Sequence, residues 1–214
     1  MKKILALVLA LTMVMAMAAC TPANNNETNG TTAGTEGTTE ATTEATTGTT
    51  EGTTVEGDNA ALNVLNAVWT AFPEEGKFPV MGGDMENPNW EGPGAVTLPG
   101  AEGNALWNLN IPDDQLPNIA EAATMIHAMN TNTFASGALK LVDGADEATV
   151  AKAILDGILN TRWMCGFPER VVVISTNGCL IVAFGHEGNI TNLQSAITAV
   201  DASATVLHNE AITG

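Results

Sequence analysis

Residues 170–185 read Arg-Val-Val-Val-Ile-Ser-Thr-Asn-Gly-Cys-Leu-Ile-Val-Ala-Phe-Gly. Two apolar, β-branched runs meet at Asn177-Gly178, which suits a two-residue type I′ turn because both central residues take positive φ. The sequence therefore predicts a β-hairpin. Its register pairs Thr176 with Cys179, Ile174 with Ile181, Val172 with Ala183 and Val171 with Phe184.

Neither face of this hairpin is polar. One face holds Val171, Val173, Leu180, Val182 and Phe184, and the other holds Val172, Ile174, Cys179, Ile181 and Ala183. An apolar hairpin needs cover on both sides, and an uncovered face of this size normally marks a binding surface. We therefore expect either an intramolecular cover or a dimer on the second face.

The chain around the hairpin predicts an α+β fold. We expect a strand at 134–142, a helix at 146–160 with Val150, Ile154 and Ile158 inward, a helix capped by Asn189 with Leu193, Ile197 and Val200 inward, and a closing strand at 205–208. The order βαββαβ is that of a ferredoxin-like fold, a four-stranded antiparallel sheet with two helices on one face. These helices should cover Leu180, Val182 and Phe184.

Upstream, the sequence predicts elements for the second sheet face. We expect a helix at 59–72, capped by Asp58 and ended by Pro73, a long Gly/Pro-rich loop at 73–103, a short strand at 106–111 and a helix at 117–130. The first helix places Leu62, Leu65, Trp69 and Phe72 on one side. The N-terminal helices and the loop should pack over Val172, Ile174 and Ile181.

The N-terminus has the pattern of an export signal. Lys2-Lys3 precede an apolar run that is too short for a comfortable transmembrane helix, and small residues lead to Cys20. Met17-Ala18-Ala19-Cys20 resembles the lipobox of bacterial lipoproteins, in which the cysteine receives a diacylglycerol. Residues 1–19 are therefore predicted to be a lipoprotein signal peptide and Cys20 a lipid anchor on the extracytoplasmic side of the cell membrane.

Residues 20–57 consist almost wholly of Thr, Gly, Glu, Ala and Asn, which predicts a disordered tether before a single domain at 58–214. That domain holds 18 acidic and 5 basic residues, a net charge of about −13. Such a surface repels phosphate backbones, so nucleic acid is not an expected partner. A cationic partner or a divalent ion would suit it.

Two cysteines follow Cys20. Cys179 lies beside the hairpin turn, whereas Cys165 enters at the opposite end, roughly 20 Å away along the strand. A disulfide needs Cα atoms within about 7 Å, so we expect two free thiols. The same register brings Cys165 toward His186, and a cysteine beside an imidazole is a nucleophile in some enzymes. The alternative interpretation is that Cys165 packs in an apolar wall formed by residues 163–168.

Acidic residues crowd one predicted loop. Asp84, Glu86 and Glu91 offer oxygen ligands of the kind that Ca²⁺ selects, but no EF-hand spacing is present, and solvated acids are the simpler interpretation. His127 is interpreted as a partly buried, hydrogen-bonded histidine rather than a ligand. Hydrolase, nucleotide-binding and dinucleotide-binding motifs are absent from the sequence, so no cofactor is expected.

Three stretches carry a family resemblance: residues 78–84 (Phe-Pro-Val-Met-Gly-Gly-Asp), 125–130 (Met-Ile-His-Ala-Met-Asn) and 163–168 (Trp-Met-Cys-Gly-Phe-Pro). Together they resemble a family of small secreted bacterial lipoproteins of unassigned function, some of them labelled bacteriocin transport accessory proteins. The resemblance covers about residues 58–212. It implies a partner role in export or self-protection and supplies no catalytic residue. The absence of Cys-x-x-Cys separates the chain from thioredoxin-like accessory proteins.

Three hypotheses of function follow. The first is a non-enzymatic, lipid-anchored module that binds an envelope protein, peptide or ligand. The second is a cysteine-dependent enzyme that uses Cys165 and His186. The third is a Ca²⁺-stabilised structural domain.

Overall fold

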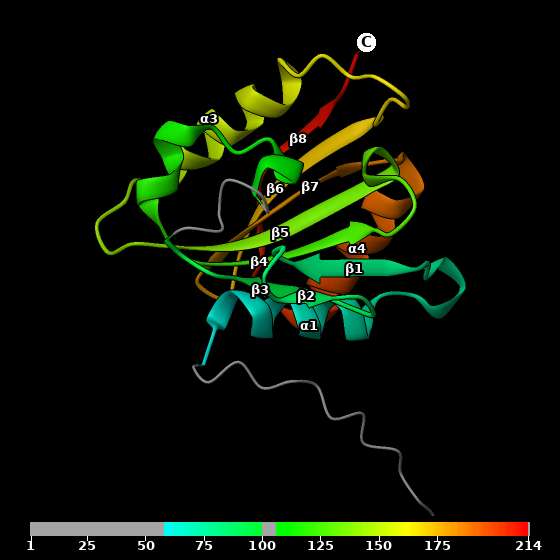
Figure 1. Ribbon diagram of the computed structural model, residues 1–214, viewed down its shortest axis with the longest axis horizontal. Coiled ribbons are helices and arrows are strands. Elements are labelled where there is room, and N and C mark those ends of the chain that lie inside the picture. Colours follow the sequence, from blue (N-terminus) through cyan, green and yellow to red (C-terminus); the bar gives the residue numbers. More distant parts are fainter. Residues whose placement is uncertain (1–57, 100–105, 214) are drawn as a thin grey trace, which may run out of the picture. The chain divides into compact units, whose positions relative to one another are not determined.

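The computed structural model of the protein describes residues 58–99 and 106–213 (Figure 1). They form an α+β fold on an open antiparallel sheet of eight strands, with the order β2-β1-β4-β5-β7-β6-β8 and β3 paired with β4. The strands are β1 (Val80–Gly83), β2 (Pro88–Asn89), β3 (Gly94–Val96), β4 (Ile119–His127), β5 (Phe134–Leu141), β6 (Arg170–Thr176), β7 (Cys179–Gly185) and β8 (Thr205–Ala211). The predicted signal peptide, Cys20 and the tether lie outside the described residues.

The hairpin forms as predicted. Thr176 pairs with Cys179 and Val171 with Phe184, and the intervening pairs follow the expected register. Asn177 and Gly178 both have positive φ, 48° and 74°. Asp201 supports the turn, because the Thr176 hydroxyl donates to Asp201 Oδ2 at 2.8 Å. Hydrogen bonds from the Ser203 hydroxyl, the Ser203 N–H and the Thr176 hydroxyl lower the pKa of Asp201 to about 2.

The ferredoxin-like arrangement is not confirmed. In the predicted four-stranded sheet, β8 would close the fold beside β5. Instead β4 pairs with that edge of β5, and β8 pairs with β6. The extra strands β1 to β4 come from the N-terminal half of the domain, where a covering loop and a second helix were expected, and they extend the sheet. β8 is thus an edge strand in the described part of the chain.

The two sheet faces are covered by different helices (Figure 1). α3 (Glu147–Leu159) packs Val150, Ile154 and Ile158 on the face with Leu180, Val182 and Phe184. α1 (Ala60–Ala71) and α4 (Glu187–Val200) pack together on the other face, over Val172, Ile174 and Ile181. The prediction that both late helices share one face is therefore wrong, whereas the N-terminal helix does cover the second face. Both hairpin faces are equally apolar, so the sequence does not distinguish them.

Both helix caps that the sequence predicts, Asp58 and Asn189, are wrong. Asp146 caps α3, and its side chain accepts from Thr149 N–H. Asn59, not Asp58, caps α1, and its side chain accepts from Leu62 N–H at 2.8 Å. α4 begins at Glu187 with His186 as its N-cap residue, so Asn189 lies inside the helix.

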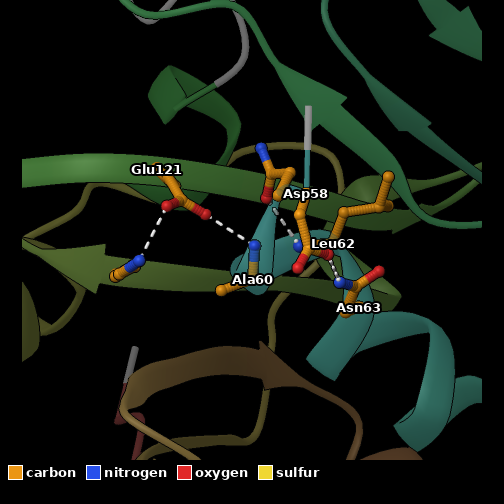
Figure 2. A network of polar contacts seen from close by, with 7 residues as sticks. Asp58, Ala60, Leu62, Asn63 and Glu121 are labelled. Carbon is orange, nitrogen blue, oxygen red and sulfur yellow. Dashed lines mark hydrogen bonds and ion pairs between the residues drawn. The ribbon is translucent and has the colours of Figure 1, made fainter. Parts of the chain in front are cut away.

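A carboxylate on β4 holds the start of α1 (Figure 2). Glu121 Oε2 accepts from Ala60 N–H at 2.6 Å, and Glu121 Oε1 accepts from Lys140 Nζ at 2.8 Å. The hydrogen bond from Lys140 is the main reason that the pKa of Glu121 lies below its ordinary value. Asp58 instead accepts from the Asn63 amide at 2.6 Å. The N–H groups of a helix's first turn have no acceptor within the helix. Glu121 supplies one for Ala60, and this hydrogen bond helps to fix the position of α1 on β4.

The predicted helix at 117–130 is wrong, because these residues form the 3₁₀ helix η3 (Asp113–Asn118) and then strand β4. Residues 122–126 are buried, with β5 on one edge and β1 and β3 on the other. A strand buried on both faces reads as a continuous apolar run, which periodicity does not separate from a helix. The alanines of this stretch have a high intrinsic helix propensity, but pairing with the neighbouring strands outweighs it.

The segment predicted as a loop contains part of the sheet. Residues 73–99 include the 3₁₀ turn η1 (Glu74–Gly76) and strands β1, β2 and β3. The predicted strand at 106–111 is instead the 3₁₀ helix η2 (Leu106–Leu109), with Leu106 and Leu109 buried. A further 3₁₀ turn, η4 (Thr131–Thr133), joins β4 to β5. No helix in the described residues is long and apolar enough to span a bilayer.

Two glycines allow β1 and β3 to share one edge of β4. A Cβ on Gly82 would lie 2.1 Å from the Thr124 carbonyl oxygen and 2.3 Å from the Gly94 nitrogen. The Thr124 hydroxyl completes the junction, since it accepts from Gly83 N–H at 2.9 Å and donates to Gly83 O at 3.1 Å. This close backbone contact fixes the position of β1, and with it the position of Met81.

Candidate functional site

The stretches that carry the family resemblance meet at one pocket. The pocket has a volume of about 460 Å³, and its lining comes from β1, the end of β4, the β4–β5 connection and the loop before β6: Met81, Ile126, His127, Ala128, Met129, Asn130, Thr131, Asn132 and Cys165. These residues include members of 78–84, 125–130 and 163–168. Segments far apart in the sequence thus form a single hollow at one end of the sheet.

Sheet register places the lining residues on two faces. Met81 pairs directly with Ile126, so both side chains lie on the face under α3, where Ile126 belongs to the core and Met81 packs against it. His127 pairs with Val80 on the opposite face. There its imidazole stacks on Phe78, with ring centroids 5.0 Å apart and planes 16° apart.

The imidazole of His127 is already engaged. Its Nδ1 accepts from Met129 N–H at 3.1 Å and from Asn130 N–H at 3.3 Å. In the neutral ring the proton therefore resides on Nε2. The prediction of a partly buried, hydrogen-bonded histidine is confirmed, although the residue ends a strand and not a helix. Its role is to shape the turn that forms one wall of the pocket.

Asn132 ties two pocket walls together. Its Nδ2 donates to the carbonyl oxygen of Met164 at 3.0 Å and to that of Gly166 at 3.2 Å. Its own N–H donates to Asn130 Oδ1 at 3.0 Å. Sequence reasoning missed this residue. The only available signal was the polar run at 130–133 between two apolar segments, which also describes any solvated turn.

The loop before β6 exposes Cys165. Trp163 is partly buried, and its ring packs on Phe184 at a centroid distance of 4.9 Å, so one end of the loop is fixed to the core. Cys165 then takes a left-handed conformation with φ 62°, followed by Gly166 at 136°. The predicted apolar wall is only partly correct, because Met164 and Phe167 are 72% and 62% exposed.

Cys165 and His186 are not brought together as a pair. His186 is exposed, its backbone N–H donates to Thr133 O at 3.0 Å, and it does not line the pocket. The adjacent Glu187 carboxylate binds Arg170 at 2.8 Å. Across residues 58–99 and 106–213, no hydrogen bond links Cys165 to His186. Both cysteines are free thiols, and burial raises the pKa of the Cys179 thiol in the core under α1 and α4.

The acidic loop has a structural explanation. Asp84 is 4% exposed, and its carboxylate accepts the backbone N–H groups of Glu86 and Asn87, both at 2.8 Å, and of Thr97 at 2.7 Å. Burial raises the pKa of Asp84, but these hydrogen bonds outweigh it and hold the pKa below its ordinary value. Glu86 and Glu91 are exposed. Among the described residues there is no group of three His, Cys, Asp or Glu side chains that could hold a metal ion.

Most basic side chains of the domain are neutralised. Ion pairs join Lys77 to Glu74, Lys140 to Glu121, Lys152 to Asp156 and Arg170 to Glu187. The domain has five basic residues in all, so the surplus of acids faces solvent nearly uncompensated.

No protein-family model matches the chain, and no curated protein and no solved structure is detectably similar to it.

Proposed function

We propose that the chain is an exported, lipid-anchored binding module of the bacterial cell envelope that has no catalytic activity of its own. Its binding site is the pocket that Cys165 lines. The observation that carries this proposal is the group of apolar side chains held in solvent in the segments that form the pocket: Met129 (84% exposed), Met164 (72%) and Phe167 (62%). Burying one such side chain contributes roughly 1.5–3 kcal/mol. These side chains remain exposed in the folded domain, so a partner that covers them would gain this free energy on binding.

The proposed location of the module at the cell membrane rests on the sequence. The basic start, the apolar run and the small residues before Cys20 support export and anchoring at that cysteine. The tether at 20–57 would hold the domain away from the membrane surface. Mass spectrometry of the mature N-terminus tests this assignment, because the chain should begin at a diacylated Cys20. An unmodified Met1 would refute it.

The relationship to small secreted lipoproteins, including those labelled bacteriocin transport accessory proteins, is part of the proposal. It is supported by the fact that residues 78–84, 125–130 and 163–168 all contribute to the lining of one pocket. An accessory role in export would then be carried by this pocket. Its partner would be an envelope protein or a peptide, and not nucleic acid.

Photo-crosslinking in the native bacterium tests the partner. A photoreactive phenylalanine analogue at position 129, at the pocket, should give a discrete crosslinked product with an envelope protein or peptide. The matched control is position 85, because Met85 is 81% exposed but lies in the β1–β2 loop outside the pocket lining. Equal products at both positions, or none at 129, would refute the proposal.

A further inference from the structure

Three of the seven sulfur-containing residues at 58–214 line this pocket. Residues 58–214 contain five methionines. Met81 and Met129 line the pocket together with Cys165, and Met164 precedes that cysteine in the chain. The remaining two lie apart, since Met125 is buried in the core under α1 and α4, and Met85 lies in the β1–β2 loop.

These donors belong to one chemical class. Thiolates and thioethers are soft ligands that favour Cu(I), whereas carboxylates, carbonyls and water suit Ca²⁺ and Mg²⁺. His127 is a poor metal ligand here, because its Nδ1 accepts two backbone N–H groups and its ring stacks on Phe78. The described residues also lack any group of three His, Cys, Asp or Glu side chains suited to a harder cation.

The backbone around the pocket is fixed, and Met81 packs against the core, whereas the exposed methionines beside the pocket can change their side-chain conformation. Asn132 holds the carbonyl groups on both sides of Cys165, and Gly82 fixes the strand that carries Met81. Met129 and Met164 are long, unbranched and exposed, so their thioethers can adjust to a ligand without disturbing the core.

We propose that this pocket binds a soft monovalent cation, Cu(I) or its analogue Ag(I), through the Cys165 thiolate and the thioethers of Met81 and Met129. This inference rests on the proposed binding function and adds a metal ligand to the pocket that the protein or peptide partner would contact. The Cys165 S–H bond breaks, a sulfur–metal bond forms and one proton passes to solvent, with no change in the oxidation state of the metal.

The test is an anaerobic titration of the full-length lipidated protein with Cu(I), in competition with a chromophoric Cu(I) chelator. We expect one tight equivalent and the release of one proton. Cys165→Ala should weaken binding at least 100-fold. Met81→Leu and Met129→Leu should each weaken it about tenfold, since leucine keeps the volume of the side chain but removes the sulfur. Zn²⁺ should not compete.

Matched controls are present in the same chain. Cys179→Ala removes the buried thiol and Met85→Leu an exposed thioether outside the pocket, and neither should change the affinity. Binding that disappears with Cys165→Ala but is unaffected by both pocket methionine variants would mean a lone thiol and would overturn the proposal. So would the absence of a tight equivalent. Because crosslinking at position 129 does not use Cu(I), the broader binding function can survive either result.

Discussion

Gly82→Ala is expected to lower the free energy of unfolding by about 3 kcal/mol or more, because the added methyl group meets backbone atoms that cannot rotate away. The nearest are the Thr124 oxygen at 2.1 Å and the Gly94 nitrogen at 2.3 Å. Relief requires β1 or β3 to leave the edge of β4. Urea denaturation of the whole chain measures the change in midpoint.

Gly188→Ala is the matched control for this variant. Gly188 lies in the first turn of α4, and a Cβ there would have no neighbour within 4 Å. This substitution should stabilise the protein by about 0.4–1 kcal/mol, because alanine has less conformational freedom in the unfolded chain. Equal effects of the two substitutions would contradict the proposed junction of β1, β3 and β4.

Phe134→Ala should destabilise the protein by about 3–5 kcal/mol, the range for deleting a buried aromatic side chain. Phe134 is fully buried, and its ring lies 5.1 Å from that of Phe78 and 6.3 Å from that of Phe72, between centroids. It therefore joins β5 to α1 and to the segment that leads into β1. Thermal and urea unfolding measure the loss.

Phe167→Ala makes the same chemical change on the surface. Its ring is 62% exposed, so the expected effect on stability is within about 0.5 kcal/mol. A comparable loss for both phenylalanine variants would mean that the described core does not hold the domain together. A small effect for both would mean that the cavity collapses without cost, and it would also contradict the packing described here.

The hairpin was predictable because its information is local. Asn177-Gly178 specify the turn, the turn specifies the register, and the register assigns every side chain to a face. α3 was predictable for the same reason, since Asp146 and the spacing of Val150, Ile154 and Ile158 lie within one segment. Where each helix packs was not predictable, because the two hairpin faces have the same polarity.

β4 shows the opposite case. Its alanines favour a helix, and the strand exists because β5 pairs with one edge while β1 and β3 pair with the other. β5 follows directly in the chain, but β1 and β3 lie in an upstream segment whose glycines predict a loop. Gly82 and Gly94 serve close backbone contact instead, which a single sequence does not distinguish from turn formation.

The candidate site was predictable in composition but not in geometry. The stretches that carry Met81, His127 and Cys165 were singled out, yet the predicted partner of Cys165 was His186. In the structure His186 is the N-cap residue of α4, and the His127 ring stacks on Phe78 on the other sheet face. Asn132 and its acceptors beside Cys165 are more than 30 residues apart in the sequence, so no local sequence pattern predicts their hydrogen bonds.

If the chain is an exported binding module, the pocket lined by Cys165 is occupied at the outer surface of the cell. Occupancy is measured by comparing the labelling of Cys165 with that of a reporter, Met85→Cys, by a membrane-impermeant maleimide. In the purified protein both thiols should react, because both positions are exposed. In intact cells of the native bacterium the reporter should still react, whereas Cys165 should react at least about tenfold more slowly, as 90% occupancy would produce. The same ratio of rates in cells and in the purified protein would contradict an occupied pocket, and failure to label the reporter in intact cells would contradict export.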